Sequence, residues 1–587
     1  MQKIGRISLL FLILTPIWAM AQGRGSGGHP PSYTNPATNA RNAAVLGTGN
    51  NITGSYGAPS AQDESRVEFR TQTILVQVPA VVTDKSGKHV RGLTQADFTI
   101  QENGKPVKVE HFEEMTGDSA PIITQPTTPG TFHNLALDPQ HPRNVVVIAL
   151  DTVNTPFLDQ AYGRKELVKF LAQTVSTNQV LSLMLITSHG LMVVQGLSND
   201  PASIVAVLKK VGGETSPMET ESTDAQADIA AGTMQSNLRM INGADAFTAM
   251  NNFVEYGDPL ETQFRQENAI ETTMNAFLGI AWSLQGVPGR KSLIWATGGF
   301  PFTLFSPDNI PGGHLSSLYE RAMLALNEAQ VAVYPVDIRG LTSGAIGGGK
   351  GGRISTQQMV NRAWLQQGGI DTLNEFADMT GGKAFYNTND LAGSFRRAAE
   401  DGSSYYMLSY YLDTQNNKPG WRKLHVKVGR PDVEVRARNG FLVTNTTMNP
   451  RLTRDLDMIN AMRSPIEGTG IPVSVQWIGE TADGAKKKTS FLAHMAPGSL
   501  SFDPGGRDLL NFDVAAVAFD KDGKEVAQAA QNFSKPVPEA QLASVRANGV
   551  GFRNSLELSP GTYTVRFVVR DNVTGKIGSL TAPLIVN

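Results

Sequence analysis

The feature that most limits the possible fold is an unbroken apolar run, Val145–Leu150, which ends at Asp151. A run of this kind is typical of a strand buried on both faces of a parallel sheet. Strand-like and helix-like patterns alternate after it, and such alternation predicts right-handed crossovers. We therefore expect a doubly wound α/β domain over residues 142–402, with an insertion of weak pattern at 212–260.

Strand-like patterns also lie on both sides of this domain. Residues 67–114 form an N-terminal β segment, and residues 403–443 form a second one. Each has too few strands for a stable isolated domain, which predicts that the two pair into one sandwich with the α/β domain inserted between them. Residues 450–463 are expected to form a linker helix, and residues 471–587 an immunoglobulin-like β-sandwich.

The N-terminal end of the chain carries the signs of export. Residues 1–21 predict a signal peptide, because basic side chains precede an apolar stretch that ends in a small-x-small pattern at 19–21. A membrane anchor is the alternative, but the stretch is shorter than the roughly 20 residues that a span needs. Residues 22–66 are rich in Gly, Asn, Ser and Pro and predict a disordered tail. We expect a periplasmic or extracellular protein with no transmembrane segment in the mature chain.

Composition excludes several classes of function. The 51 basic and 53 acidic side chains nearly cancel, so no general electrostatic attraction to nucleic acid is expected. The chain contains no cysteine, which excludes disulfides, Cys-ligated zinc, iron–sulfur clusters and a cysteine nucleophile.

The sharpest chemical motif is Asp151-Thr152-Val153-Asn154-Thr155, at the carboxyl end of the first buried strand. Ligands of open α/β sheets lie beyond this end of the strands. A carboxylate with hydroxyls two and four residues further on can hold a hard cation through oxygen atoms. Thr155 supplies the second hydroxyl, whereas Val153 stands at the first position and cannot ligate.

The same segment resembles the von Willebrand factor A family, a Rossmann-like fold whose metal-ion-dependent adhesion site opens with Asp-x-Ser-x-Ser. Asp151 and Thr155 match the first and last ligand positions of that motif. Gly298 stands at the position of the family's second ligating Asp. Thr215 is the candidate for the Thr that the family places in a loop. Because Val153 and Gly298 depart from the motif, we expect a degenerate site. The one candidate cofactor is Mg²⁺ or another divalent cation, with Asp151 and Thr155 as its ligands.

Asp337 is a further carboxylate at the end of a predicted strand. In the strand order of the family it lies two strands from Asp151, which is roughly 10 Å at about 4.8 Å per strand. The two carboxylates therefore cannot share one Mg²⁺, whose bonds are about 2.1 Å long, unless a loop folds in. The simpler expectation is that Asp337 caps a loop or pairs with Arg339 or Arg290.

A narrower resemblance, over residues 70–443, is to the von Willebrand factor A-related proteins of the acidobacterial type. It is carried by short stretches before, inside and after the α/β domain: Val81–Gly87, Gly92–Phe98, Arg290–Trp295, Gly420–Leu424 and Arg436–Phe441. The resemblance implies an exported binding module and names no ligand.

These observations favour a binding protein over an enzyme. The expected function is binding of a protein ligand at the sheet edge around Asp151, Thr155 and the loop 298–313, in adhesion or in the cell envelope. One alternative is a structural or assembly factor of the envelope that needs no metal. The other is a hydrolase with an unrecognised site in the insertion 212–260.

Overall fold

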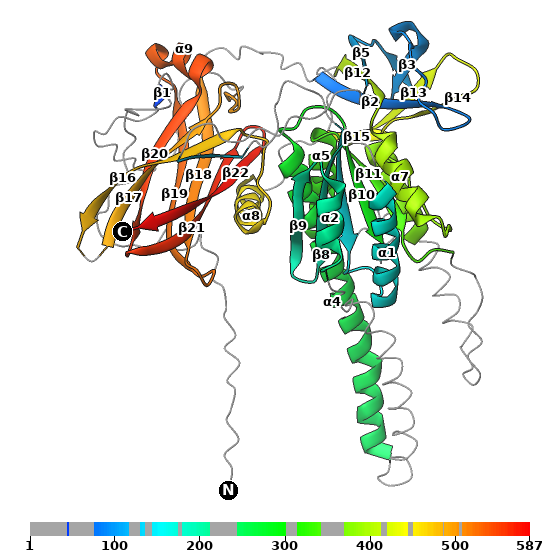
Figure 1. Ribbon diagram of the computed structural model, residues 1–587, viewed down its shortest axis with the longest axis horizontal. Helices are drawn as coiled ribbons and strands as arrows, with labels where there is room; N and C mark the ends of the chain where they lie inside the picture. The colour runs from blue at the N-terminus through cyan, green and yellow to red at the C-terminus, as the bar shows by residue number, and fades with distance from the viewer. Residues whose placement is uncertain are drawn as a thin grey trace.

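The computed structural model describes residues 44–45, 75–116, 130–134, 144–173, 179–211, 244–300, 314–341, 369–412, 420–443, 450–484, 486–503 and 508–587. Over these residues the protein is a multidomain, mixed α/β structure in which strands predominate, arranged in five sheets. Figure 1 shows a central α/β unit, a β unit above it and a second β unit beside it. None of the described helices combines the length and the apolar character needed to cross a bilayer.

The sheet of the central unit has the strand order β11-β10-β7-β8-β9. Its strands are β7 (Asn144–Asp151), β8 (Gln179–Thr187), β9 (Gly190–Ser198), β10 (Lys291–Thr297) and β11 (Val331–Asp337). All neighbours pair in parallel except β9, which is antiparallel to β8 at the edge. Every residue of β7 is buried, because its apolar run lies between two strands and under helices on both faces.

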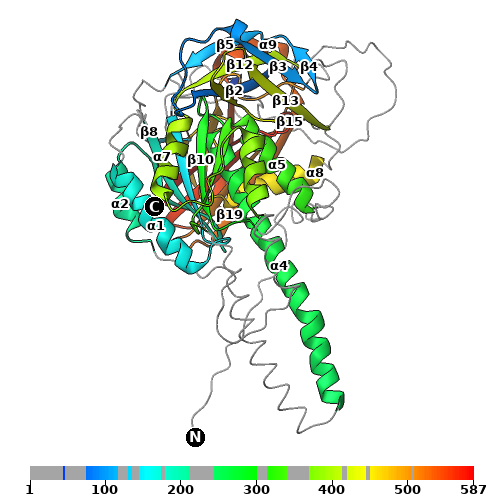
Figure 2. The same cartoon turned by 90° about the vertical axis from the view of Figure 1, so that its right-hand side faces the viewer.

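Helices cover both faces of this sheet. On one face lie α4 (Ala244–Leu284) and α5 (His314–Glu328), and on the other lie α1 (Phe157–Gln173), α2 (Pro201–Leu208) and α7 (Leu391–Asp401). Trp295 is fully buried in the first of these two cores, with its ring edge-on to Phe277 and Phe376. One end of α4 extends well past the sheet, as Figure 2 shows.

The upper β unit is built from two segments that flank the α/β unit in the sequence. The first gives β2 (Leu75–Asp84), β3 (Phe98–Glu102), β4 (Lys105–Val107) and β5 (His111–Met115). The second gives β12 (Tyr405–Tyr411), β13 (Gly420–Val428), β14 (Val433–Arg436) and β15 (Gly440–Val443). They pair as β14-β2-β12-β5 and β15-β13-β3-β4, and the two sheets share one core around Val78, Ile100 and Tyr406.

The C-terminal β unit also consists of two sheets, β1-β20-β17-β16-β6 and β19-β18-β21-β22. Its long strands are β16 (Val473–Asp483), β17 (Lys486–Met495), β18 (Leu509–Phe519), β19 (Glu525–Pro536), β20 (Val550–Leu558), β21 (Gly561–Asp571) and β22 (Ile577–Val586), and α9 covers Glu539–Asn548. One core lies between the sheets, where Phe491 and Phe567 meet edge-on with ring centroids 5.0 Å apart.

Two strands come from parts of the chain that the sequence does not mark as strands. Ala44–Val45 forms β1, parallel to β20, and the rest of the predicted tail over 22–66 lies outside the described residues. Thr131–His133 forms β6, which pairs with β16 although it lies in a Pro- and Thr-rich linker. The adjoining Asn134 is buried and donates to the carbonyl oxygens of Gly468 and Ile471, which fixes β6 at this edge. The predicted signal peptide lies outside the described residues.

The predicted insertion differs in the central unit. The helix α4 begins at Ala244, so it takes up the end of the predicted insertion 212–260 and continues through Pro259. The remainder of the insertion, 212–243, lies outside the described residues. Phe385 extends the sheet beyond β11 by a single bridge to Val336, with backbone hydrogen bonds to Asp337 and Pro335.

The upper β unit docks at the amino edge of the central sheet. Arg290, directly before β10, donates from its backbone to the Tyr405 hydroxyl at 2.9 Å and from its guanidinium to the Tyr334 hydroxyl at 2.8 Å. Tyr334 donates in turn to Asp401 at 2.6 Å, and Asp401 is paired with Arg436 of β14. These polar contacts occupy the end of the sheet that is opposite to the carboxyl edge.

The C-terminal unit docks through α8 (Pro450–Arg463), which packs against α4. Asp457 of α8 is 6% exposed and is paired with Arg321 of α5 on one side and Arg570 of β21 on the other. The two Arg570 bonds to its Oδ2 measure 2.8 and 3.0 Å. One carboxylate thus joins three elements.

Lys291 makes the stability of the central unit dependent on pH. It is 2% exposed, and its ammonium donates to the Val287 carbonyl at 2.7 Å. Burial lowers the pKa of Lys291 to about 7, whereas an unfolded chain keeps this proton up to about pH 10.4. Between these two values the unfolded chain binds more protons, so stability rises with pH.

We expect the free energy of unfolding to rise between about pH 7 and about pH 10 more steeply in the wild type than in Lys291→Met. Urea unfolding of both proteins at several pH values across this window measures the difference. Parallel pH curves for the two proteins would contradict the assignment.

Candidate functional site

Asp151 ends β7 at the carboxyl edge of the central sheet, between β10 and β8. It is 1% exposed, and Thr155 is fully buried. The loop that joins β7 to α1 therefore carries its two candidate ligands inside the protein.

Four donors surround the Asp151 carboxylate. Its Oδ1 accepts the backbone N–H of Asn154 at 2.9 Å. Its Oδ2 accepts from the Asn154 side-chain amide at 2.7 Å, the Trp295 indole N–H at 2.9 Å and the Thr297 hydroxyl at 3.1 Å. Asn154 is itself held by Thr273 of α4 at 2.9 Å. We call Asp151, Asn154, Trp295 and Thr297 the Asp151 cluster.

Burial and hydrogen bonding act in opposite directions on this carboxyl group. Burial raises the pKa of Asp151 above its ordinary value, while the bonds from Asn154, Trp295 and Thr297 lower it. The carboxylate form remains the better acceptor for four converging donors, because each bond to it is assisted by its charge.

Gly298, which follows β10, contacts the loop between β7 and α1. Its backbone N–H donates to the Thr155 hydroxyl at 2.7 Å. A Cβ atom at this position would lie 3.0 Å from the Asn154 carbonyl oxygen and 3.1 Å from Pro156 Cδ. A side chain at residue 298 would therefore crowd the backbone of the loop at 154–156.

These residues do not fit a bound divalent cation. Hydrogen-bond donors from the protein approach both oxygens of Asp151, and they stand where a cation would have to be. Val153 is an apolar side chain that is 2% exposed and belongs to the core with Trp295. Within the described residues, no group of three or more His, Asp or Glu side chains is arranged to hold a metal ion. Thr215 and the loop residues 301–313 lie outside the described part of the chain.

Asp337 is used in an ion pair at the same edge. It ends β11, two strands from Asp151 in the observed order, and is 1% exposed. Arg339 binds it with two bonds, Nε to Oδ1 at 2.9 Å and Nη2 to Oδ2 at 2.7 Å. This bidentate pair satisfies the carboxylate, as the simpler expectation from the sequence had it.

Two leucines stand exposed at this edge. Leu158 in the first turn of α1 is 77% exposed, and Leu341 after β11 is 60% exposed. Tyr162 lies one turn after Leu158 on the same helix face and donates to the Asn389 carbonyl at 3.3 Å, while the Asn389 side chain accepts from the Leu341 N–H at 3.0 Å. Asn389 thus links the helix that carries Leu158 to the turn that carries Leu341, and we call these two exposed leucines the leucine edge.

The sequence did not point to Asn154, Trp295 or Thr297 as partners of Asp151. Their donors come from two different strand ends, so no local spacing connects them. One signal was present in Trp295, because a buried indole N–H needs an acceptor. The strand that neighbours Trp295 in the parallel sheet ends in Asp151, whose carboxylate can accept the indole N–H.

The chain matches no protein-family model, and no curated protein matches it in sequence.

Proposed function

We propose that this protein is an exported binding module of the von Willebrand factor A type that holds a protein partner at the carboxyl edge of its central sheet without a metal ion. In this proposal the central unit is a doubly wound domain, and the two β units are sandwiches that carry it. The strand order, the parallel pairing and the helices on both faces support the first part. The shared cores of the paired sheets support the second.

The observation that carries the proposal is the contrast between the two ends of the sheet. The amino edge is taken by the upper β unit, through Arg290 and its partners. The carboxyl edge exposes Leu158 and Leu341, and the partly exposed Arg339 is paired with Asp337 at the same edge. Exposed apolar side chains beside charged groups are what a protein interface uses, with the apolar part at its centre.

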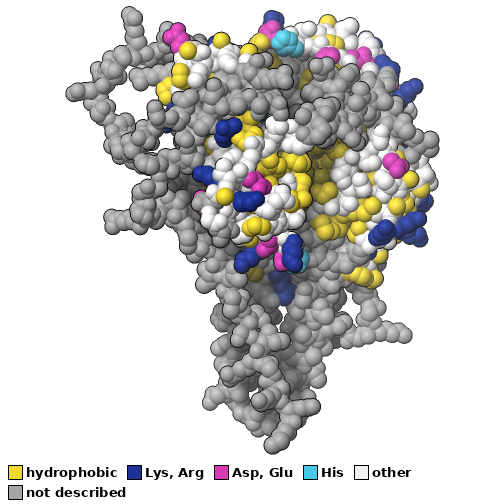
Figure 3. All heavy atoms as spheres, turned by 60° about the vertical axis from the view of Figure 1, so that its left-hand side comes forward, with side chains coloured by type: hydrophobic (Ala, Val, Ile, Leu, Met, Phe, Trp, Pro, Cys, Tyr) yellow, Lys and Arg dark blue, Asp and Glu magenta, His cyan; other side chains and the backbone are white. Residues whose placement is uncertain are grey.

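The charge of the surface agrees with a protein partner. The face drawn in Figure 3 carries basic and acidic side chains interspersed with apolar ones. The whole chain has a formal net charge of −2. Nucleic acid binding requires a strong electrostatic field of one sign, and we do not propose nucleic acid as the partner. Catalysis is not part of it either, since the Asp151 cluster is turned inward and bonded to itself.

The leucine edge gives the test. In a pulldown from an envelope extract, with EDTA present, we expect Leu158→Glu and Leu341→Glu each to lower capture of the partner about tenfold or more, since each places a charge in an apolar contact. Ile585→Glu is the matched control, because Ile585 is 64% exposed on the C-terminal unit. Equal capture by all four proteins, or capture that EDTA abolishes, would overturn the proposal. The second supports the metal-dependent adhesion function instead.

A further inference from the structure

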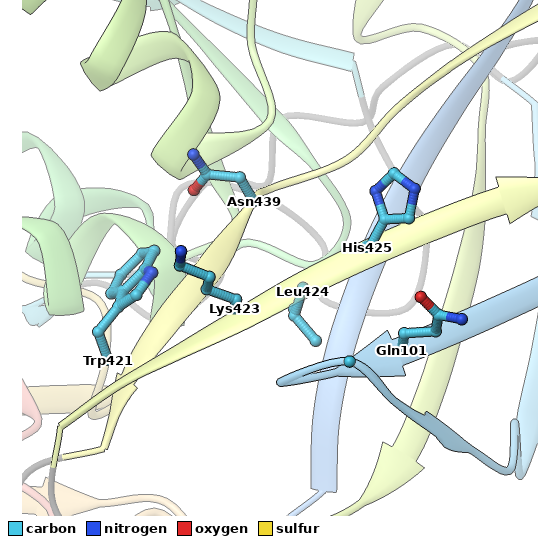
Figure 4. A pocket seen from close by; sticks show the side chains of 7 residues that line it. Gln101, Trp421, Lys423, Leu424, His425 and Asn439 are labelled. Carbon is cyan, nitrogen blue, oxygen red and sulfur yellow. The ribbon is translucent and has the colours of Figure 1, made fainter.

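A pocket of about 390 Å³ opens on the outer face of the upper β unit, away from the leucine edge. Gln101, Gly104, Trp421, Lys423, Leu424, His425 and Asn439 line it. Figure 4 shows the labelled side chains around one open space, on β3, on β13 and in the segment before β15. The proposed function makes no use of it.

The alternation of side chains along β13 places its polar and basic side chains on this face. Leu424 and Val426 are 5% and 7% exposed and belong to the core, so the residues that alternate with them along the strand project outward. Lys423 and His425 are both exposed. Gln101 of β3 stands directly opposite His425 in the antiparallel register, which brings an amide beside the imidazole.

The pocket is held in shape by its own backbone. Lys423 exchanges two bonds with Asn103, at 2.8 and 2.9 Å. The Leu424 N–H donates to the Asn439 carbonyl at 2.7 Å. At Gly440 a Cβ atom would lie 2.3 Å from Trp421 Cζ2, so the indole packs directly on a glycine backbone. Trp421 is thus a fixed and partly exposed aromatic wall.

The groups that line the pocket select a particular ligand chemistry. Lys423 offers a cation, and none of the described residues that line the pocket is acidic. Among the described residues, neither Lys423 nor His425 is in a salt bridge. The amides of Gln101 and Asn439 can each donate and accept hydrogen bonds, as hydroxyl groups require. An indole wall adds an apolar surface for a ring.

We propose that this pocket binds an acidic sugar, a uronic acid unit of a polysaccharide. The ammonium of Lys423 binds the sugar carboxylate, the two amides bind ring hydroxyls, and the C–H face of the ring lies on Trp421. The pocket opens to solvent and is not an enclosed cavity, so one unit of a longer chain can bind in it. Nucleic acid also combines negative charge with stacking, but the near-neutral chain lacks the wider basic surface that it needs.

Calorimetric titration of the full mature chain with trigalacturonate tests the proposal. We expect saturable binding that Lys423→Glu weakens about tenfold or more, because it replaces attraction by repulsion at the carboxylate. Gln101→Ala, which keeps the charge, weakens it by a smaller factor. Lys427→Glu is the matched control, since Lys427 is an exposed lysine of the same strand outside the lining.

Three results would overturn the proposal: no saturable binding at millimolar sugar, an equal loss in Lys423→Glu and Lys427→Glu, or binding of triglutamate as tight as that of trigalacturonate. The second result means general charge attraction, and the third means an acidic peptide site. Maltotriose, which has no carboxylate, is expected to bind at least about tenfold more weakly than trigalacturonate.

Discussion

Asp457→Ala is expected to lower the free energy of unfolding by about 3–5 kcal/mol, the usual effect of removing one partner of a buried ion pair. The side chains of Asp457, Arg321 and Arg570 are 8%, 12% and 9% exposed. Without the carboxylate, both guanidinium groups remain buried beside each other with no acid between them. The C-terminal unit should then separate from the central unit more easily.

Urea unfolding measures the loss of stability, and limited proteolysis of the segment around α8 measures the separation. Arg546→Ala is the control, because the Arg546–Asp508 pair is 64% and 37% exposed and an exposed pair contributes about 0–1 kcal/mol. If Asp457→Ala and Arg546→Ala lower stability equally, the Asp457 network does not hold the units together.

Asp151→Ala is expected to cost a similar amount, about 3–5 kcal/mol, because it leaves several buried donors without an acceptor. Asp151→Asn tests the cause. Its amide oxygen can take the three donors at Oδ2, while its NH₂ group meets only the Asn154 backbone N–H. We therefore expect Asp151→Asn to cost about 1–2 kcal/mol, the effect of one misplaced donor.

Thermal unfolding of the two Asp151 variants in EDTA separates a structural carboxylate from a metal ligand. In EDTA a ligand for a cation would have no partner, and both substitutions would be close to neutral or stabilising. A large loss in Asp151→Ala and a small loss in Asp151→Asn agrees with the Asp151 cluster.

The central sheet was the part of the fold that the sequence predicted best, because burial on both faces leaves a clear mark. Val145–Leu150 reads as a strand before any contact is known. The start of α4 was not predictable in the same way, since Gly257 and Pro259 weaken a helical pattern. The helix continues through them in the structure. The low helix propensity of Gly257 and Pro259 therefore did not decide the structure of this segment.

The sequence did not predict strands that form only because a neighbouring strand is there to pair with them. Thr131–His133 has no alternation of its own, and it is a strand only because β16 offers a free edge and Asn134 is bonded next to it. The candidate site shows the same limit. Gly298 could be noted as a missing ligand, but its close approach to Asn154 and Thr155 depends on how two strand ends meet.

The central claim is that the carboxyl edge works without a metal ion, and the effect of divalent cations on melting temperature tests it most directly. A cation bound by the folded protein at 100 times its dissociation constant adds about 2.7 kcal/mol of stability. With Mg²⁺, Mn²⁺ or Ca²⁺ at millimolar concentration, we predict no rise in the melting temperature of the wild type or of Asp151→Asn. A rise in the wild type that Asp151→Asn loses would contradict the claim.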